Sequence, residues 1–206
     1  MYKVFFNQKP LILTNEIQEF SDSEPFMFIK YSSAAQIIKA LKSTKNTKVY
    51  LYHKNLDKLW KTFKKQFPVI EAAGGLVERT DNKLLFIFRN NKWDLPKGGV
   101  EKNELIIEAA KREVTEETGV ADLIVQNPLS ETYHIFKKGK RFRLKKTYWF
   151  NMSTSYTGQL QPQIEEGILK TEWISKDGIK DFLNDAFENI RIIVLEVLDR
   201  DFFRDK

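Results

Sequence analysis

A segment near the middle of the chain combines a helical hydrophobic pattern with many glutamate residues. It reads LPKGGVEKNELIIEAAKREVTEETGV, from Leu95 to Val120. Nothing between residues 104 and 118 breaks a helix, Asn103 can cap its start, and Gly119 can end it in a left-handed conformation. An apolar stripe at spacings of three and four residues consists of Ile106, Ala109, Ala110 and Val114. This stripe predicts that one side of the helix lies on a sheet.

The same helix gathers three carboxylates on one face. Glu113, Glu116 and Glu117 are separated by the three- and four-residue steps that make side chains neighbours on a helix. Like charges at this spacing destabilise a helix by roughly 0.2–0.5 kcal/mol per pair. Arg112 and Lys111 are adjacent, but we expect them to project at other angles and not to neutralise the whole cluster. A solvated surface helix is the ordinary interpretation of such a pattern, and a bound cation is the functional one.

Composition narrows the choice of cation. Mg²⁺ takes oxygen ligands from a few carboxylates, with water and substrate phosphates completing its coordination. The chain contains no cysteine, and the predicted domain around the helix contains one histidine, His134, which argues against zinc. Before the helix, Gly98 and Gly99 permit a close approach to a phosphate, with Lys97 as a positive donor beside them. We therefore expect a Mg²⁺ or Mn²⁺ site next to a phosphate-accepting loop.

These residues resemble the Nudix box of the Nudix hydrolases. The pattern is Gly98, five residues, Glu104, seven residues and then REVTEETGV from Arg112 to Val120, without a departure from the family's pattern. AAGGLV before the box and EWIS after it extend the resemblance more loosely. The resemblance implies an α+β fold, the Nudix α/β/α sandwich with a mixed sheet. It also implies metal-dependent hydrolysis of a diphosphate linked to another moiety.

The resemblance further implies roles for single residues. The metal ligands would be Glu113, Glu116 and Glu117, with Gly98 in the same site. Glu113 or a nearby glutamate such as Glu116 would take a proton from the attacking water, a role that a carboxylate within hydrogen-bond reach can perform. Glu104 would orient this set, and Arg112 would hold a catalytic glutamate by ion pairing. Glu165 and Glu166, in a later loop, are candidates for a further ligand or the base, and a solvated pair is the alternative.

Substrate preferences rest on weaker signals. WDLPKGG, from Trp93 to Gly99, resembles the branch of dinucleoside polyphosphate and diphosphoinositol polyphosphate hydrolases. The candidate substrate contacts are Lys97, Arg89, Tyr148 and Arg143. Strand alternation puts Arg141, Arg143 and Lys145 on one face, which could receive extra phosphates or an RNA 5′ end. A solvated hairpin is an equally good interpretation of that face. Trp93 either stacks on a base or anchors its loop in the core.

Two units are expected along the chain. Residues 1–67 read as a small α/β domain of unknown role, and residues 68–206 read as the Nudix hydrolase domain, with Pro68 at the boundary. The first unit shows no catalytic constellation. Its lysine-rich helices allow a protein-binding or RNA-binding module, although they are also ordinary solvent faces.

The predicted function is a Mg-dependent pyrophosphohydrolase that cleaves a phosphoanhydride of a nucleoside diphosphate linked to another moiety. The expected substrate is a dinucleoside polyphosphate or a related polyphosphorylated small molecule. The alternatives are a nucleotide-binding regulatory protein and an RNA 5′-end pyrophosphohydrolase. A net charge of +6 favours polyanionic partners. No apolar run approaches the roughly 20 residues of a membrane-spanning helix, so a cytoplasmic location without a membrane partner is expected. The oligomeric state stays open, a dimer included.

Overall fold

The computed structural model describes residues 1–17, 19 and 21–204 and divides into two compact units. The first unit consists of Met1–Ile70 and Thr132–Lys146, and the second of Glu71–Glu131 and Thr147–Lys206. The hairpin segment Thr132–Lys146 therefore packs with the N-terminal residues, although it follows the Nudix box in sequence. The functional boundary after residue 67 stays a prediction.

In the described part of the first unit, the strands follow the order β10-β1-β2-β4-β3. β1 (Tyr2–Phe6) and β2 (Lys9–Thr14) form an antiparallel hairpin. β4 (Val49–Tyr52) pairs in parallel with β2 and with the short β3 (Phe26–Phe28). On the other side, β10 (Thr132–Lys138) pairs in parallel with β1.

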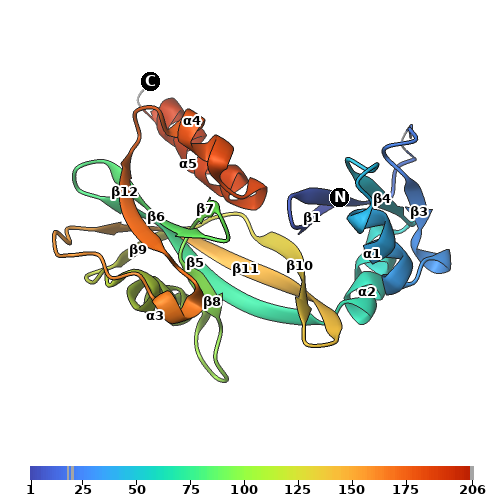
Figure 1. The fold of residues 1–206 in the computed structure, drawn as a ribbon, viewed down its shortest axis with the longest axis horizontal. Coiled ribbons are helices and arrows are strands. Elements are labelled where there is room, and N and C mark those ends of the chain that lie inside the picture. The colour runs from blue at the N-terminus through green and yellow to red at the C-terminus, as the bar shows by residue number, and fades with distance from the viewer. Residues whose placement is uncertain (18, 20, 205–206) are drawn as a thin grey trace. The chain divides into compact units, whose positions relative to one another are not determined.

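Two helices of the first unit cover one face of these strands (Figure 1). α1 (Ala34–Lys42) is capped by Ser33, and α2 (Leu56–Gln66) is capped by Asn55. A single turn of 3-10 helix, Ile29–Tyr31, precedes α1. The fully buried side chains between helices and strands include Val4, Leu11, Leu13, Ile37, Leu51, Leu59 and Phe63. This unit therefore has a hydrophobic core of its own.

The second unit is built on a sheet in the order β12-β6-β5-β11. Its long strands are β5 (Val69–Arg79), β6 (Lys83–Arg89), β11 (Arg141–Thr154) and β12 (Lys170–Ser175), although the first residues of β5 and of β11 belong to the first unit. Three shorter strands lie beside them: β7 (Lys92–Asp94) pairs with β6, β8 (Lys97–Gly99) with β5, and β9 (Ile124–Pro128) with β11.

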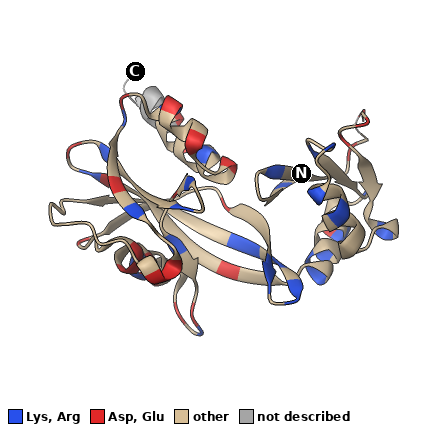
Figure 2. Ribbon diagram, viewed as in Figure 1, with Lys and Arg blue, Asp and Glu red and all other residues tan. Residues whose placement is uncertain are grey.

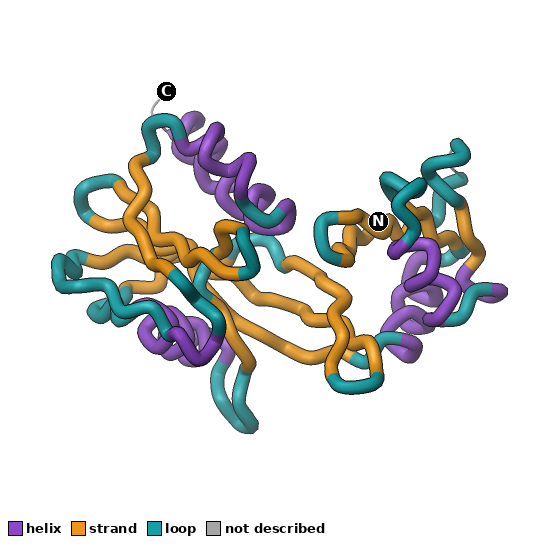
Figure 3. Tube along the Cα trace, in the orientation of Figure 1, coloured by secondary structure: helices purple, strands orange, loops and turns teal. Residues whose placement is uncertain are grey.

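Helices cover both faces of this sheet (Figures 1 and 3). α3 (Ile106–Thr118) packs on one face; α4 (Ile179–Phe182), the 3-10 turn Leu183–Asp185 and α5 (Glu188–Arg204) lie on the other. Alternation along β6 divides the core, because Leu84 and Phe86 pack with α5 while Leu85 packs with α3. This arrangement confirms the predicted α+β fold with an α/β/α sandwich. Among the described residues, no helix has the length and apolar character needed to cross a membrane.

The Glu-rich helix begins later than predicted. α3 starts at Ile106 with Leu105 at its N-cap and no side-chain cap, whereas Asn103 adopts a left-handed conformation with φ of 65°. Glu104 therefore lies in the turn before the helix, where its carboxylate accepts a hydrogen bond from the backbone N of Glu101. The predicted end is confirmed, since Gly119 has φ of 75°. The apolar stripe also packs on the sheet as predicted.

Candidate active site

Arg112 is the centre of the acidic cluster on α3. Its Nε and Nη2 donate to the two carboxylate oxygens of Glu104 at 2.8 and 2.9 Å. Its Nη1 donates to Glu113 at 2.8 Å and to Glu116 at 2.9 Å, and Nη2 also reaches the carbonyl oxygen of Gly99 at 2.9 Å. The expectation that Arg112 projects away from the cluster was therefore wrong. Its long side chain and planar fork let one guanidinium contact three carboxylates.

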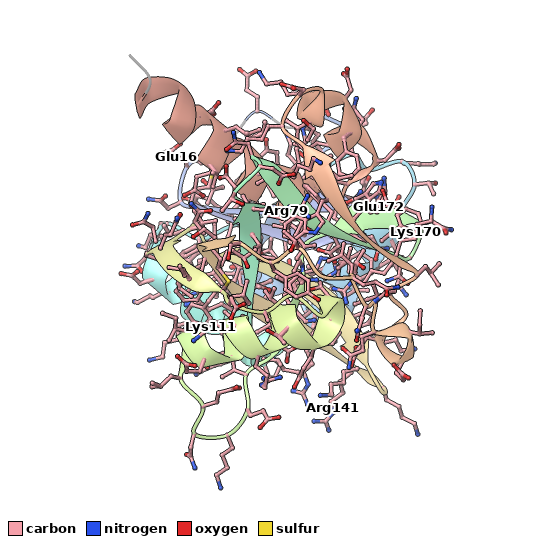
Figure 4. All side chains as sticks on the ribbon, turned by 90° about the vertical axis from the view of Figure 1, so that its left-hand side faces the viewer. Glu16, Arg79, Lys111, Arg141, Lys170 and Glu172 are labelled. Carbon is pink, nitrogen blue, oxygen red and sulfur yellow. The ribbon has the colours of Figure 1, made fainter. Side chains whose placement is uncertain are left out.

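The neighbouring Lys111 behaves as predicted. It pairs with Glu108 at 3.6 Å and contributes nothing to the acidic cluster. The stick view shows Lys111 on α3 (Figure 4), and the charge-coloured ribbon shows acidic residues gathered on that helix (Figure 2).

Glu113 lies directly against the glycine loop. A Cβ added to Gly98 would fall 1.8 Å from Oε2 of Glu113, so only glycine leaves room for this carboxylate. At Gly99 an added Cβ would have no atom within 4 Å. β8 holds Gly98 in register with Ala73 of β5, which fixes the loop against the helix. Any side chain at position 98 would therefore require the carboxylate of Glu113 to move.

Glu117 belongs to a second and more buried network. Its side chain is 2% exposed and accepts a hydrogen bond from the backbone N of Lys97 at 2.8 Å. Arg89 approaches Glu117 at 3.7 Å and donates to Asp94 at 2.9 Å. The Nζ of Lys97 completes the network at 2.7 Å from Asp94. Two cations and two carboxylates therefore pair with little solvent contact.

The surroundings lower the pKa of Glu104 and Asp94 and raise that of Glu113 and Glu117. Hydrogen bonds from Arg112 lower the pKa of Glu104 to about 2. Burial raises the pKa of Glu113, against the opposing effect of Arg112. Burial also raises the pKa of Glu117 to about 7, although Lys97 and Arg89 act to lower it. At Asp94 burial acts upward, but the charges of Lys97 and Arg89 outweigh it and hold its pKa below the ordinary value.

Asp94 is the site residue that sequence reasoning missed. It lies within WDLPKGG, but its carboxylate is only 6% exposed and contacts both Lys97 and Arg89. The available signal was a lone acid in an apolar stretch beside a lysine, because a buried acid needs a cationic partner. Lys97 and Arg89, predicted as substrate contacts, thus have a structural partner, and their contact with a substrate stays a prediction.

The loop that carries Glu165 and Glu166 is anchored to the end of α3. The backbone N of Gln161 donates to Thr118 O at 2.8 Å, and that of Gln163 donates to Glu117 O at 3.2 Å. Both glutamates lie in the 3-10 turn Ile164–Glu166 and are exposed. The charge of Glu166 is among the causes that raise the pKa values of Glu113 and Arg89. Glu166 is therefore within electrostatic range of the acidic cluster.

The remaining residues predicted to contact the substrate or a base have recorded contacts with residues outside the acidic cluster, or belong to the first unit. The hydroxyl of Tyr148 donates to Glu71 at 2.7 Å. Arg143 belongs to the first unit, and its role stays a prediction. The ring of Trp93 packs against Phe88 and Phe182 at centroid distances of 5.0 and 4.9 Å, which supports the alternative that Trp93 anchors its loop in the core.

The donor set suits a hard divalent cation, but it is not arranged around one point. Within the part of the chain that the structure describes, no three metal-ligating side chains are positioned together to hold an ion. The reason is visible in the contacts: Arg112 binds Glu113 and Glu116, while Glu117 faces Lys97 and Arg89. All the candidate ligands are oxygens, which Mg²⁺ and Mn²⁺ prefer. The room that Gly98 leaves beside Glu113 also fits such a site.

Comparison with known proteins identifies the family. The model of the NUDIX domain matches residues 69–194, which is more than half of the chain and contains the whole site described above. The chain belongs to the Nudix family. This Nudix protein is accordingly a hydrolase that acts on phosphoanhydride bonds.

Two relatives of this Nudix protein are RNA pyrophosphohydrolases. That of Pelagibacter ubique is 29% identical over 161 residues, which cover 66% of this chain and 98% of the relative. That of Erythrobacter litoralis is 35% identical over 83 residues, which cover 35% of this chain. The match spans about half, 48%, of the Erythrobacter protein.

Solved structures share the fold at low sequence identity. A Nudix hydrolase from M. smegmatis superposes with a TM-score of 0.51 at 16% identity, covering 66% of this chain and 89% of that one. The NUDIX domain of NrtR from Shewanella oneidensis, solved with ADP ribose, gives a TM-score of 0.50 at 19% identity, covering 66% and 91%. These likenesses concern the fold alone.

Proposed function

We propose that this Nudix hydrolase removes pyrophosphate from the 5′-triphosphorylated end of RNA in a metal-dependent reaction. The observation that carries the proposal is the similarity to the RNA pyrophosphohydrolase of Pelagibacter ubique, which extends over 98% of that protein. The complete set of Glu104, Arg112, Glu113, Glu116 and Glu117 supports hydrolysis over ligand binding alone. A regulatory binding protein has no need of a water-activating cluster.

In the proposed reaction, a water oxygen attacks a phosphorus of the 5′ triphosphate. Its proton passes to a carboxylate, one P–O–P bond breaks, and pyrophosphate leaves behind a 5′-monophosphate. Glu113 is our first candidate for the base, because burial raises its pKa and makes it a better proton acceptor. Glu116 and Glu166 are the alternatives.

The ligands proposed for Mg²⁺ or Mn²⁺ are Glu113, Glu116 and Glu117, together with Gly98. Such an ion, when bound, neutralises phosphate oxygens and acidifies coordinated water. The protein's own contribution is orientation, since Arg112 restrains Glu104, Glu113 and Glu116 at once. Charge-assisted and bidentate contacts of this type fix geometry as well as adding energy.

Glu117 is positioned by a separate set of contacts. The backbone N of Lys97 binds one of its oxygens, and Arg89 lies near the other. Asp94 shares the same two cations, Lys97 and Arg89, and contacts them at 2.7 and 2.9 Å. The contact between Arg89 and Glu117 is longer, at 3.7 Å, so Arg89 holds Glu117 less closely than it holds Asp94.

Dinucleoside polyphosphates are the second candidate substrates. The observation that favours them is WDLPKGG, which resembles the branch of the family that hydrolyses them. They present the same chemical feature as the RNA 5′ end, a chain of phosphoanhydrides attached to a nucleoside. Tyr148 is the residue proposed to lie near the base in either case.

A substrate panel tests the proposal. The full chain would be incubated with 5′-triphosphorylated RNA, dinucleoside polyphosphates, nucleoside triphosphates, ADP-ribose and diphosphoinositol polyphosphates, each with and without Mg²⁺ or Mn²⁺. We expect the highest kcat/KM for the RNA and no release without metal. A preference for any of the small molecules would reject the RNA assignment and keep the phosphoanhydride chemistry.

A further inference from the structure

Charge is divided unequally between the two units. The first unit carries 19 Lys or Arg and five Asp or Glu, a net charge of +14. The second carries 15 Lys or Arg and 23 Asp or Glu, a net charge of −8. The overall value of +6 conceals this contrast. The attraction for polyanions therefore belongs to the unit that lacks the Nudix box.

The strand pairing of the first unit concentrates this charge at one edge. β1 and β10 run in parallel, with Phe6 beside Ile135. The turn that leads to Lys9 and the turn between β10 and β11 therefore leave the strands in the same direction. The second turn contains the exposed side chains of Lys137, Lys138, Lys140 and Arg141. Arg141 is labelled in the stick view (Figure 4).

The C-terminal end of α1 joins the same edge. The Nζ of Lys9 donates to the carbonyl oxygen of Ser43, the C-cap of α1, at 2.5 Å. The Nζ of Lys42 lies 5.6 Å from the ring centre of Phe142, which in turn packs edge-on against Phe6 at 6.0 Å. Three segments that are distant in sequence thus form one surface. We call it the basic edge, and it consists of Lys9, Lys42, Lys137, Lys138, Lys140 and Arg141.

No acid compensates the basic edge within the described part of the chain. Segments 1–15, 25–56 and 132–146, which contribute to it, contain no Asp or Glu. Among the described residues, none of its six side chains forms an ion pair with a carboxylate. The ribbon coloured by charge shows Lys and Arg at the β10–β11 turn and along α1 and α2 (Figure 2). Like charges held together repel, and a polyanion relieves that repulsion.

We infer that the basic edge binds the phosphate backbone of single-stranded RNA. A chain of phosphodiesters matches a row of uncompensated cations, and counterion release drives such binding. The half-buried ring of Phe142 lies beside Lys42 and offers apolar surface for a base. The inference goes beyond the proposed function, because binding of the backbone does not depend on which phosphoanhydride is hydrolysed.

The test uses the full chain and a 5′-hydroxyl RNA oligonucleotide of mixed sequence. This RNA has no phosphoanhydride, so its binding is independent of hydrolysis. The variant combines Lys138→Gln, Lys140→Gln and Arg141→Gln, all at exposed positions around a turn. Loss of three contacts should lower the slope of log Kd against log salt by about 2 and weaken binding roughly 100-fold at 0.1 M salt. An unchanged Tm would show that the variant is folded.

A matched control removes the same charge from α2 with Lys58→Gln, Lys61→Gln and Lys65→Gln, which are also exposed. Its Kd should change by no more than roughly threefold, because long-range attraction is screened at this ionic strength. Equal effects of the two triple variants would overturn the inference. The same follows if the wild type binds no RNA, if it binds anionic vesicles in its place, or if duplex RNA or single-stranded DNA binds more tightly.

Discussion

Arg112 donates hydrogen bonds of 2.8 and 2.9 Å to the two carboxylate oxygens of Glu104, although Glu104 lies before the helix that carries Arg112. The same guanidinium contacts Glu113 and Glu116. One cation therefore connects the turn after the glycine loop with the acidic face of α3. The position of each carboxylate depends on the planar shape of this side chain as much as on its charge.

Replacement of Arg112 by lysine is expected to lower kcat about 100-fold, because a point charge cannot hold three carboxylates and small displacements of catalytic groups are costly. KM should change less than kcat. The measurement is steady-state hydrolysis of the best substrate of the panel. Lys111→Gln is the control, since Lys111 pairs with Glu108, and it should retain wild-type kcat. Full activity of Arg112→Lys would show that the shape of the guanidinium is unimportant.

The two adjacent glycines provide a matched pair. In Gly98→Ala the new Cβ would meet Oε2 of Glu113 at 1.8 Å, whereas in Gly99→Ala it would meet nothing within 4 Å. Gly98→Ala should therefore displace Glu113, weaken metal binding and reduce kcat at least about tenfold, a cost of roughly 1.4 kcal/mol. Activity as a function of Mn²⁺ concentration would reveal the change. Equal behaviour of the two variants would contradict the steric role of Gly98.

Asp94→Asn should destabilise the protein by roughly 3 kcal/mol, because it leaves Arg89 and Lys97 without the carboxylate that both contact. The free energy of unfolding in urea measures this. Asp81→Asn is the control, because Asp81 pairs with Arg79 and Lys83 at the surface, and no measurable loss is expected. A small effect of Asp94→Asn would mean that the buried cations find other partners.

The loss of stability caused by Asp94→Asn is expected to depend on pH. The pKa of Asp94 is lower in the folded state than its ordinary value of about 3.9. The unfolded state therefore takes up a proton first, and the stabilisation is complete above that value and lost as pH falls through the folded pKa. The difference in unfolding free energy between wild type and Asp94→Asn should shrink as the pH is lowered from about 6 to 3. A difference that does not vary with pH would be inconsistent with a charged Asp94.

Much of the hydrolase unit could be predicted because its signals are local. The stripe of Ala109, Ala110 and Val114 placed α3 on a sheet, and Gly119 marked its end. The caps of α1 and α2, Ser33 and Asn55, are also local, since each side chain accepts a hydrogen bond from a backbone N three residues on. Where a residue's partner lies nearby in sequence, spacing alone indicates the structure.

The remaining features depend on contacts between distant residues. The pairing of β10 with β1 joins residues more than a hundred positions apart, and no local pattern indicates it. The pairing of Asp94 with Arg89 and Lys97 depends on how β6, β7 and β8 come together. The strand β3 has three residues after a proline, which are too few to show a clear alternation in the sequence. The start of α3 was predicted too early because the ion pair between Glu104 and Arg112, which holds Glu104 in the turn before the helix, was not foreseen.

The most direct measurement compares wild type with Glu117→Gln in Mg²⁺-dependent phosphate or pyrophosphate release. The substitution keeps the shape of a side chain that is 2% exposed and removes the charge proposed to bind the metal. We expect a nearly complete loss of release, an unchanged Tm and weaker Mn²⁺ binding. Wild-type release by a folded Glu117→Gln protein, at the same metal concentration, would contradict the assignment of this carboxylate cluster as the metal site.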